Sequence, residues 1–440
     1  MKKLLKKKII FSGTKRLRRV NALLFVGILM IGMYGCGGPS KKGEQWNYAK
    51  DEITGTKKTS SESLNVDVYL DVTTSMKGYV SPNTTNFSKL MDDIEATCQD
   101  VWKKTDIKYF KYGRSVVPIS RAEFVSGKNS VDIFSDPQLS TQTNFAGALQ
   151  TTNASRLSIL ITDFFYNNSD INLVVNAIKD SCIQKNPNVE VGVIGLTSPF
   201  NGIVGDVSPA VSVKGDRPLY VILFGEKQNI TSMFNVIKNK PYINGNQLFM
   251  ITEKPTEDFT VEVKKDPAKN NKIKIAQGNL GSIKDYGTVY GFRMDAKEKD
   301  ALLDFTITLS TTPFISTITP ANLKYSVYKK TLGKPDSTAA DDELKITDLQ
   351  QSGNTITGKI NISNSDADGK YSYAVYFGLN NTNQPKLPSW IENVNTETFA
   401  QGVNENKTLN LSKLLGDIST VFNTVRNPKV AKFFIHLEKN

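Results

Sequence analysis

Between residues 63 and 240, short apolar runs alternate with helical patterns, and this alternation limits the folds open to the chain. The apolar runs predict strands at Val66–Leu70, Ile107–Phe110, Leu157–Ile161, Val189–Leu196 and Leu219–Phe224. Helical stripes lie between them, at Phe87–Trp102, Phe145–Thr151, Ile171–Gln184 and Ile230–Ile237. Strands that alternate with helices favour parallel βαβ units. We therefore expect an α/β domain with a doubly wound, mostly parallel sheet covered on both faces.

Residues 250–440 follow a different pattern, in which apolar and polar residues alternate. The clearest runs are Leu303–Leu309 and Tyr371–Phe377. A period of two is typical of strands with one buried face, so we expect a mainly β, sandwich-like C-terminal domain. A division into two small domains near residue 335 is an alternative. A helix is expected around Leu411–Phe422, and the apolar cluster at Leu387–Ile391 is expected to pack against the β domain.

Polar side chains follow two of the predicted strands. Asp71, Thr73 and Ser75 form a turn after the first strand, and Asp163 ends the third. The carboxyl ends of strands in an open α/β sheet form a crevice where ligands bind, so Asp71 and Asp163 are expected at the same edge. Oxygen ligands suit hard cations such as Mg²⁺ or Ca²⁺. The alternative is a metal-free domain in which these residues only cap strands and helices.

These residues resemble the metal-ion-dependent adhesion site of the von Willebrand factor type A (VWA) family. The Asp-x-Ser-x-Ser motif of that family is matched by Asp71-x-Thr73-x-Ser75, its helix-opening Thr by Thr143, and its third motif by Asp163. The resemblance implies a Rossmann-like VWA domain over residues 63–240 that binds Mg²⁺, or Mn²⁺ or Ca²⁺.

In this family the carboxylates act largely through bound water, which leaves a coordination position open for an acidic residue of a protein partner. The resemblance therefore implies a binding protein whose ligand is another protein. One departure is that Phe164 and Phe165 follow Asp163, where the family usually has Gly. Two phenylalanines at this position could narrow the mouth of the site.

The first 35 residues contain nine Lys and Arg residues and no acidic residue, and they end in an apolar run, Val20–Gly35. This run is shorter than the about 20 residues of a membrane span and is typical of a secretory signal peptide. The sequence Met33-Tyr34-Gly35-Cys36 resembles a bacterial lipoprotein processing site, with Cys36 as the lipidated residue. Residues 36–62 would then be a lipidated cysteine and a flexible tether. An uncleaved anchor and ordinary signal cleavage are the alternatives.

The lipoprotein resemblance implies an extracytoplasmic protein anchored by lipid to a bacterial cell membrane or outer membrane. It also changes the charge of the mature chain, because the formal net charge of +12 includes the nine positive residues of the leader. Their removal leaves +3. No basic patch or arm remains in the sequence, so we expect no nucleic-acid partner.

The remaining residues with chemical potential favour structural roles. His436 is the one histidine and is far in sequence from any acidic cluster, so histidine-dependent catalytic and zinc sites are not expected. Cys98 and Cys182 lie on apolar helical stripes and are expected to be buried thiols, with a disulfide between them as the alternative. The segment Asn364–Gly369 resembles the start of a calcium loop, but its twelfth position is Val375, so a hairpin turn is expected.

Two functions from different classes follow from these patterns. The first is a lipid-anchored binding protein that uses a divalent cation to hold a protein partner in adhesion or envelope interactions. The second is a metal-independent structural or assembly scaffold of the cell envelope. We do not expect an enzyme, because no general base is evident near the motif and a metal-dependent hydrolase would need one.

Overall fold

The computed structural model describes residues 46–55, 62–81, 83–166, 168–205, 207–265, 272–275, 288–331, 336–366, 368–380 and 386–440. The predicted signal peptide, Cys36 and most of the tether lie outside these ranges. Among the described residues, strand residues outnumber helical ones, at 42% against 25%. The fold is therefore mainly β, and its strands form several separate sheets that are mostly antiparallel.

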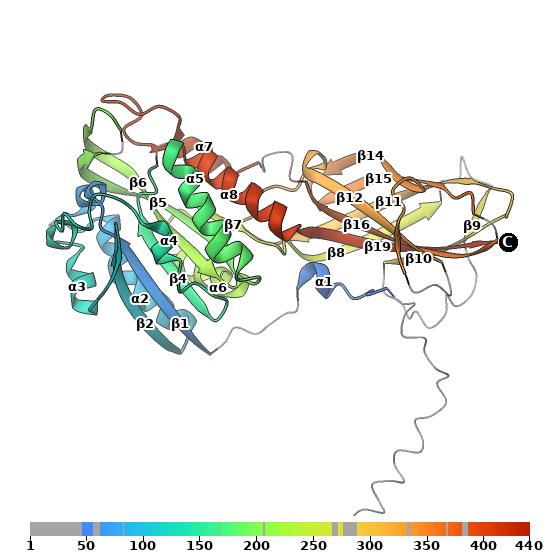
Figure 1. Cartoon of the computed structure of the whole chain (residues 1–440), viewed down its shortest axis with the longest axis horizontal. Coiled ribbons are helices and arrows are strands. Elements are labelled where there is room, and N and C mark those ends of the chain that lie inside the picture. The colour runs from blue at the N-terminus through green and yellow to red at the C-terminus, as the bar shows by residue number, and fades with distance from the viewer. Residues whose placement is uncertain are drawn as a thin grey trace, which may run out of the picture. The chain divides into compact units, whose positions relative to one another are not determined.

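The first sheet has seven strands in the order β3-β2-β1-β4-β6-β5-β7 (Figure 1). The central strand β1 (Ser63–Asp71) pairs in parallel with β2 (Lys104–Tyr112) on one side and β4 (Arg156–Thr162) on the other. The remaining neighbours pair antiparallel; they are β3 (Val116–Ile119), β5 (Glu190–Val204), β6 (Val211–Gly225) and β7 (Leu248–Ile251). Three parallel strands thus lie within a mixed sheet.

The expected doubly wound, mostly parallel α/β sheet of the Rossmann-like VWA type is therefore wrong. Strands β5 and β6 form one long hairpin, with pairs running from Glu190–Gly225 to Val204–Val211. The segment from Ser198 to Arg217 forms the outer part of this hairpin. A parallel pair needs a crossover of a dozen or more residues, and only residues 205–210 connect β5 to β6. The short connection forces β6 to run antiparallel to both β5 and β4.

Helices cover both faces of the seven-stranded sheet. On one face, α2 (Asn86–Val101) and α6 (Lys227–Ile237) share a core with Val66, Val68 and Leu70 of β1. On the other face, Tyr69 and Leu160 share a core with α4 (Phe145–Ala148), α5 (Asn168–Ile178) and α8 (Leu411–Arg426). Helix α5 continues as a π-helix, Lys179–Gln184. Shorter helices complete this region, namely η1 (Thr74–Tyr79), α3 (Arg121–Ser126) and η2 (Asp132–Phe134).

Cys98 lies in the first of these cores and Cys182 in the second. Both are free and buried, as one of the two sequence interpretations expected. Because the sheet lies between the two cores, a disulfide between these cysteines is not formed. Burial raises the pKa of both thiols to about 12, so neither is a reactive thiolate at neutral pH.

The segment that contains Trp390 packs on the seven-stranded sheet, and not on the β domain as predicted. Helix α7 (Ser389–Val394) places the indole of Trp390 against Gly195 of β5. A Cβ on Gly195 would come within 2.6 Å of the indole atom Cζ3, so only glycine leaves room for the ring. Helix α8 then lies beside α5 over the same face of the sheet (Figure 1). The core on this face thus depends on residues close to the C-terminus.

Two further sheets share a single hydrophobic core. The six-stranded sheet has the order β13-β12-β16-β19-β10-β9, and its strands are β9 (Ile273–Ile275), β10 (Val289–Met294), β12 (Leu323–Thr331), β13 (Thr338–Ala339), β16 (Gly369–Leu379) and β19 (Lys429–Lys439). The four-stranded sheet has the order β14-β15-β11-β8, with β8 (Thr256–Lys265), β11 (Asp300–Thr311), β14 (Leu344–Ser352) and β15 (Thr355–Ser363). The pairs in both sheets are antiparallel except β10–β19.

Small elements complete the described chain. They are α1 (Asp51–Thr54), η4 (Pro320–Asn322) and the two-stranded pair of β17 (Asn395–Thr396) with β18 (Thr408–Leu409). Helix α1 is fastened to β19 because the carboxylate of Glu52 pairs with Lys429 at 2.5 Å and with Lys432 at 2.8 Å.

The strand β19 carries His436, and burial lowers the pKa of its imidazole to about 4. The unfolded chain binds a proton at the ordinary pKa of about 6.5, while folded His436 stays neutral until about pH 4. Acid therefore favours the unfolded chain between these two values. The free energy of unfolding of the wild type should fall between pH 7.5 and pH 4.5. In His436→Gln this fall should be smaller by about 2 kcal/mol. Urea denaturation at both pH values measures this fall. An equal fall in the wild type and in His436→Gln would contradict the lowered pKa of His436.

Candidate functional site

The five residues predicted to form a cation site line one cavity of about 380 Å³. They are Asp71, Thr73, Ser75, Thr143 and Asp163. Asp71 is the last residue of β1, and Asp163 follows the last residue of β4. These two strands are parallel neighbours, with Leu70 opposite Ile161, so both carboxylates emerge at the same edge of the sheet. The predicted residues are thus brought together, although what they bind is a separate question.

Asp71 is buried and held by three hydrogen bonds. Its Oδ1 accepts from the backbone N–H of Thr73 at 2.9 Å and from the Thr73 hydroxyl at 2.7 Å. Its Oδ2 accepts from the hydroxyl of Thr162 at 2.8 Å. The Thr73 hydroxyl in turn lies 3.5 Å from that of Ser75. The turn after β1 therefore folds back onto its own carboxylate and presents its hydroxyls to the cavity.

Asp163 is also buried, with an exposed fraction of 5%. The Ser75 hydroxyl and the backbone N–H of Phe165 donate hydrogen bonds to its carboxylate. Its Oδ2, however, has no hydrogen-bond partner among the described residues. An unsatisfied buried carboxylate oxygen is costly, so the described residues do not fully compensate the burial of Asp163.

The two carboxylates disfavour each other's ionisation. Burial, followed by the negative charge of Asp163, raises the pKa of Asp71 to about 7. Burial also raises the pKa of Asp163, although the positive charge of Arg217 acts in the opposite direction. Two buried acids with raised pKa values beside a polar cavity are typical of functional sites and are stabilised by a cation.

The phenylalanines after Asp163 point to different cores. Phe164 adopts a positive φ of 50°, in the left-handed region that glycine enters easily, and its ring packs near Phe145 and Tyr220. Phe165 lines the cavity and meets the ring of Phe399 edge-on at 5.0 Å. Only one of the two rings therefore forms a wall of the cavity, and the departure from the VWA pattern does not fill it.

Arg217 of β6 is a residue near the site that the sequence did not reveal. Its side chain is buried, and its guanidinium carbon lies 4.9–5.3 Å from the ring centroids of Phe165, Phe200 and Phe399. Its Nε and Nη1 have no hydrogen-bond partner among the described residues. Cation–π contacts therefore hold this charge near Asp163. The long β5–β6 hairpin positions Arg217, and the sequence pattern did not predict this hairpin.

Thr162 was also missed, although it directly precedes Asp163 and its hydroxyl reaches Asp71 across the β1–β4 pair. Thr143 is half-buried and lies just before Asn144, whose Oδ1 caps α4 by accepting from the N–H of Gly147 at 2.9 Å. Asn144, not Thr143, is thus the capping residue of this helix. Thr143 is left free to present its hydroxyl to the cavity.

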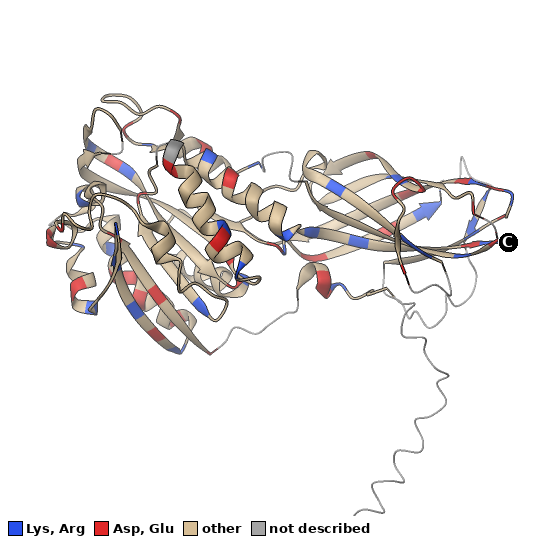
Figure 2. Ribbon diagram, in the orientation of Figure 1, with Lys and Arg blue, Asp and Glu red and all other residues tan. Residues whose placement is uncertain are grey.

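The described residues contain no cluster of three or more His, Cys, Asp or Glu side chains that could hold a metal ion. The cavity of Asp71 and Asp163 is lined by these two buried carboxylates, by the half-buried Asp170 and by several neutral hydroxyls. Lys and Arg are interspersed with Asp and Glu along the helices and strands (Figure 2). Among the described helices, none is both long and apolar enough to cross a lipid bilayer.

Comparisons of the chain with protein-family models, with curated proteins and with solved structures found no match.

The raised pKa of Asp71 predicts an unusual pH dependence of stability in the presence of a chelator. The unfolded chain ionises this residue near its ordinary pKa of 3.8, and the folded protein does so only at about 7. The free energy of unfolding therefore falls as the pH rises between these values, by no more than about 4 kcal/mol. The side chain of Asp71→Asn cannot ionise, so in this variant we expect this fall in the free energy of unfolding to be absent. Urea denaturation at pH 5 and at pH 8 measures it.

The control is Asp100→Asn, which removes an exposed carboxylate from α2 and should leave the pH dependence unchanged. If Asp71→Asn follows the wild-type pH profile, Asp71 is not a high-pKa group.

Proposed function

We propose that the cavity beside Asp71 and Asp163 binds a divalent cation, and that the protein uses this cation to hold an acidic group of a protein partner. The observation that carries the proposal is the unpartnered Oδ2 of buried Asp163, a residue that lines a polar cavity beside a second buried carboxylate. The resemblance of Asp71-x-Thr73-x-Ser75 to an adhesion motif supports the same function.

The donor set fits a hard cation such as Mg²⁺, and Mn²⁺ or Ca²⁺ in its place, because every donor is an oxygen. Asp71 and Asp163 would supply the negative charge, and Thr73, Ser75 and Thr143 would supply neutral hydroxyls. These two carboxylates would offset the charge of a dication, while the half-buried Asp170 also lines the cavity without belonging to the predicted donor set. Such an ion would keep its attraction for a further carboxylate, which the partner would provide.

A metal-independent scaffold is the second candidate, and two observations favour it. Thr73 and Thr162 already satisfy both oxygens of Asp71 without an ion. The buried guanidinium of Arg217 also places a positive charge near Asp163. In this alternative the cavity is a structural pocket, and partners bind elsewhere on the chain.

Metal titration separates the two candidates. We expect Mg²⁺ and Mn²⁺ to bind at one site in calorimetry of a soluble chain that starts at Gly37. The Asp71→Ala variant should bind at least about tenfold more weakly, because it removes a charged ligand from the set. The exposed Asp100→Asn variant should bind as the wild type does.

Absence of heat in both proteins would overturn the cation proposal and favour the scaffold. A pull-down from envelope extracts then distinguishes the two functions at the level of partners. Capture that EDTA abolishes supports cation-dependent binding, whereas capture that persists in EDTA supports the scaffold.

The proposal includes a lipid anchor at Cys36, on the bacterial cell membrane or outer membrane and facing away from the cytoplasm. Its support is the sequence alone, namely the basic leader, the apolar run Val20–Gly35 and the Gly35–Cys36 pair. We expect Cys36→Ser to abolish incorporation of labelled palmitate and to move the protein out of the membrane fraction. Retention of the label in the variant would contradict lipidation at this residue.

A further inference from the structure

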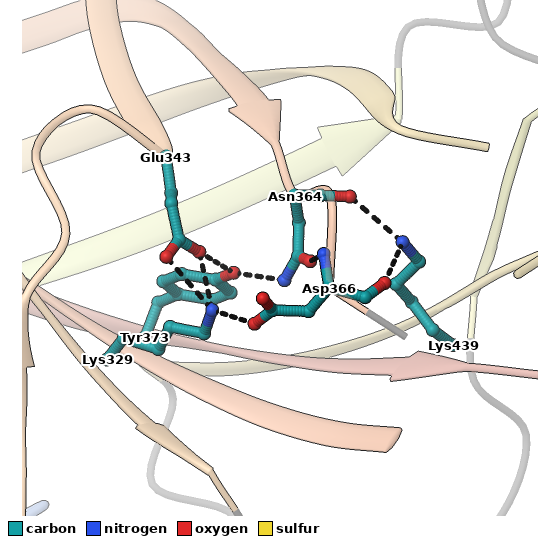
Figure 3. A network of polar contacts seen from close by, with 6 residues as sticks. All are labelled: Lys329, Glu343, Asn364, Asp366, Tyr373 and Lys439. Carbon is teal, nitrogen blue, oxygen red and sulfur yellow. Dashed lines mark hydrogen bonds and ion pairs between the residues drawn. The ribbon is translucent and has the colours of Figure 1, made fainter. Parts of the chain in front are cut away.

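A second cluster of reactive groups lies between the two sheets that share one core, far in sequence from the cavity of Asp71. Lys329 of β12 is buried, and 8% of its side chain is exposed. Its Nζ donates to both oxygens of Glu343, at 2.9 and 2.7 Å, and also to the Oδ2 of Asp366 (Figure 3). One amine is therefore in contact with two carboxylates that come from different connections of the chain.

The carboxylate of Glu343 and the backbone of Asp366 are each held in place by further contacts. The hydroxyl of Tyr373 donates to Oε2 of Glu343 at 2.9 Å and accepts from the side-chain amide of Asn364 at 2.6 Å. The Oδ1 of Asn364 accepts from the backbone N–H of Asp366 at 2.8 Å. Lys439 of β19 donates to the carbonyl oxygens of both Asn364 and Asp366, at 2.9 and 2.8 Å.

The surroundings of the amine are aromatic. The Nζ of Lys329 lies 4.8 Å from the ring centroid of Tyr371 and 6.0 Å from that of Tyr373. The side chain of Asp366 is the most exposed of the three reactive groups, at 44%. The amine is thus enclosed, while the carboxylate that it touches has access to solvent.

We propose that Lys329 and Asp366 form an intramolecular amide bond and that Glu343 relays the protons of the reaction. The Nζ attacks Cγ of Asp366, a new Nζ–Cγ bond forms, and one Cγ–O bond breaks. Two of the three ammonium protons leave with the released oxygen as water, and the third stays on the amide nitrogen. The positive charge of Lys329 and the negative charge of Asp366 disappear together, and no oxidant or other reactant is needed.

Glu343 is needed because the amine rests in its charged form. Burial lowers the pKa of Lys329, but the hydrogen bonds to Asp366 and Glu343 outweigh this effect and raise the pKa overall. The Nζ must lose a proton before it can attack, and Glu343 accepts it at hydrogen-bond distance. Glu343 then returns the proton to the oxygen that leaves Asp366. Contact between fixed groups gives the attack the advantage of an intramolecular reaction.

The bond would close the chain between β12 and the connection that leads from β15 to β16. A covalent link of this kind restricts the unfolded chain and so raises the free energy of unfolding, as a disulfide does. An ion pair with a carboxylate as exposed as that of Asp366 contributes little in comparison. The two carboxylates also lie where β14 begins and where β15 has just ended, so the bond ties both sheets of this core together.

Peptide mapping by mass spectrometry of the full-length chain tests the proposal. We expect one branched peptide that contains both Lys329 and Asp366, lighter by one water than the two linear peptides together. Trypsin should fail to cleave after Lys329. Only linear peptides, with normal cleavage after Lys329, would overturn the proposal.

Two variants test the roles of the residues. Lys329→Arg keeps the positive charge and the ion pairs but lacks the amine, so the branched peptide should disappear while circular dichroism stays that of the wild type. Glu343→Gln keeps the size of the side chain but cannot accept the proton, so it should accumulate the linear peptides. A branched peptide that forms fully in Glu343→Gln would refute the proton relay.

Discussion

The parallel pairing of β1 with its two neighbours is the constraint on which the seven-stranded sheet depends. Strand β1 is buried on both faces, since Val66, Val68 and Leu70 enter one core and Tyr69 the other. A parallel sheet needs this burial on both sides, and the helices supply it. The same pairing aligns the ends of β1 and β4, so the chemistry at the cavity follows from the packing of the core.

That alignment has an energetic cost, because it buries two carboxylates at one edge of a sheet. Hydrogen bonds from Thr73 and Thr162 compensate Asp71, and the cation–π-held Arg217 partly compensates Asp163. One oxygen of Asp163 remains uncompensated among the described residues. Local conflicts of this kind cluster at functional sites, and this is the physical basis of the proposed binding function of the cavity.

Much of the local structure could be predicted from the sequence between residues 63 and 240. Unbroken apolar runs and helical stripes locate β1, β2, β4, α2 and α6 to within a few residues, because the period of an apolar pattern reports secondary structure directly. Most of the predicted cavity residues could be found for a related reason. Asp71, Thr73, Ser75 and Asp163 follow strand ends, and neighbouring parallel strands bring such positions together. Thr143 follows no strand and was indicated by the family resemblance alone.

The direction of the later strands could not be predicted in the same way. Strands β5 and β6 are buried on both faces near the sheet centre, so their apolar runs look the same whether they pair parallel or antiparallel. The deciding feature is the part of the β5–β6 hairpin that extends past the neighbouring strands. In the sequence of this part, polar and apolar residues alternate only weakly. The position of Arg217 depends on this hairpin, and that of Trp390 depends on the return of a distant segment to the sheet. Neither the hairpin nor the return produces a periodic pattern in the sequence.

Residues 387–439 contribute to two of the cores, the one on the α5 face of the seven-stranded sheet and the one between the other two sheets. This constrains the order in which the protein can fold. Helix α8 covers one face of the seven-stranded sheet, and β19 lies between β16 and β10 within the six-stranded sheet. These two cores can close only once residues 387–439 have joined them, so the part of the chain that precedes this segment cannot complete its packing by itself.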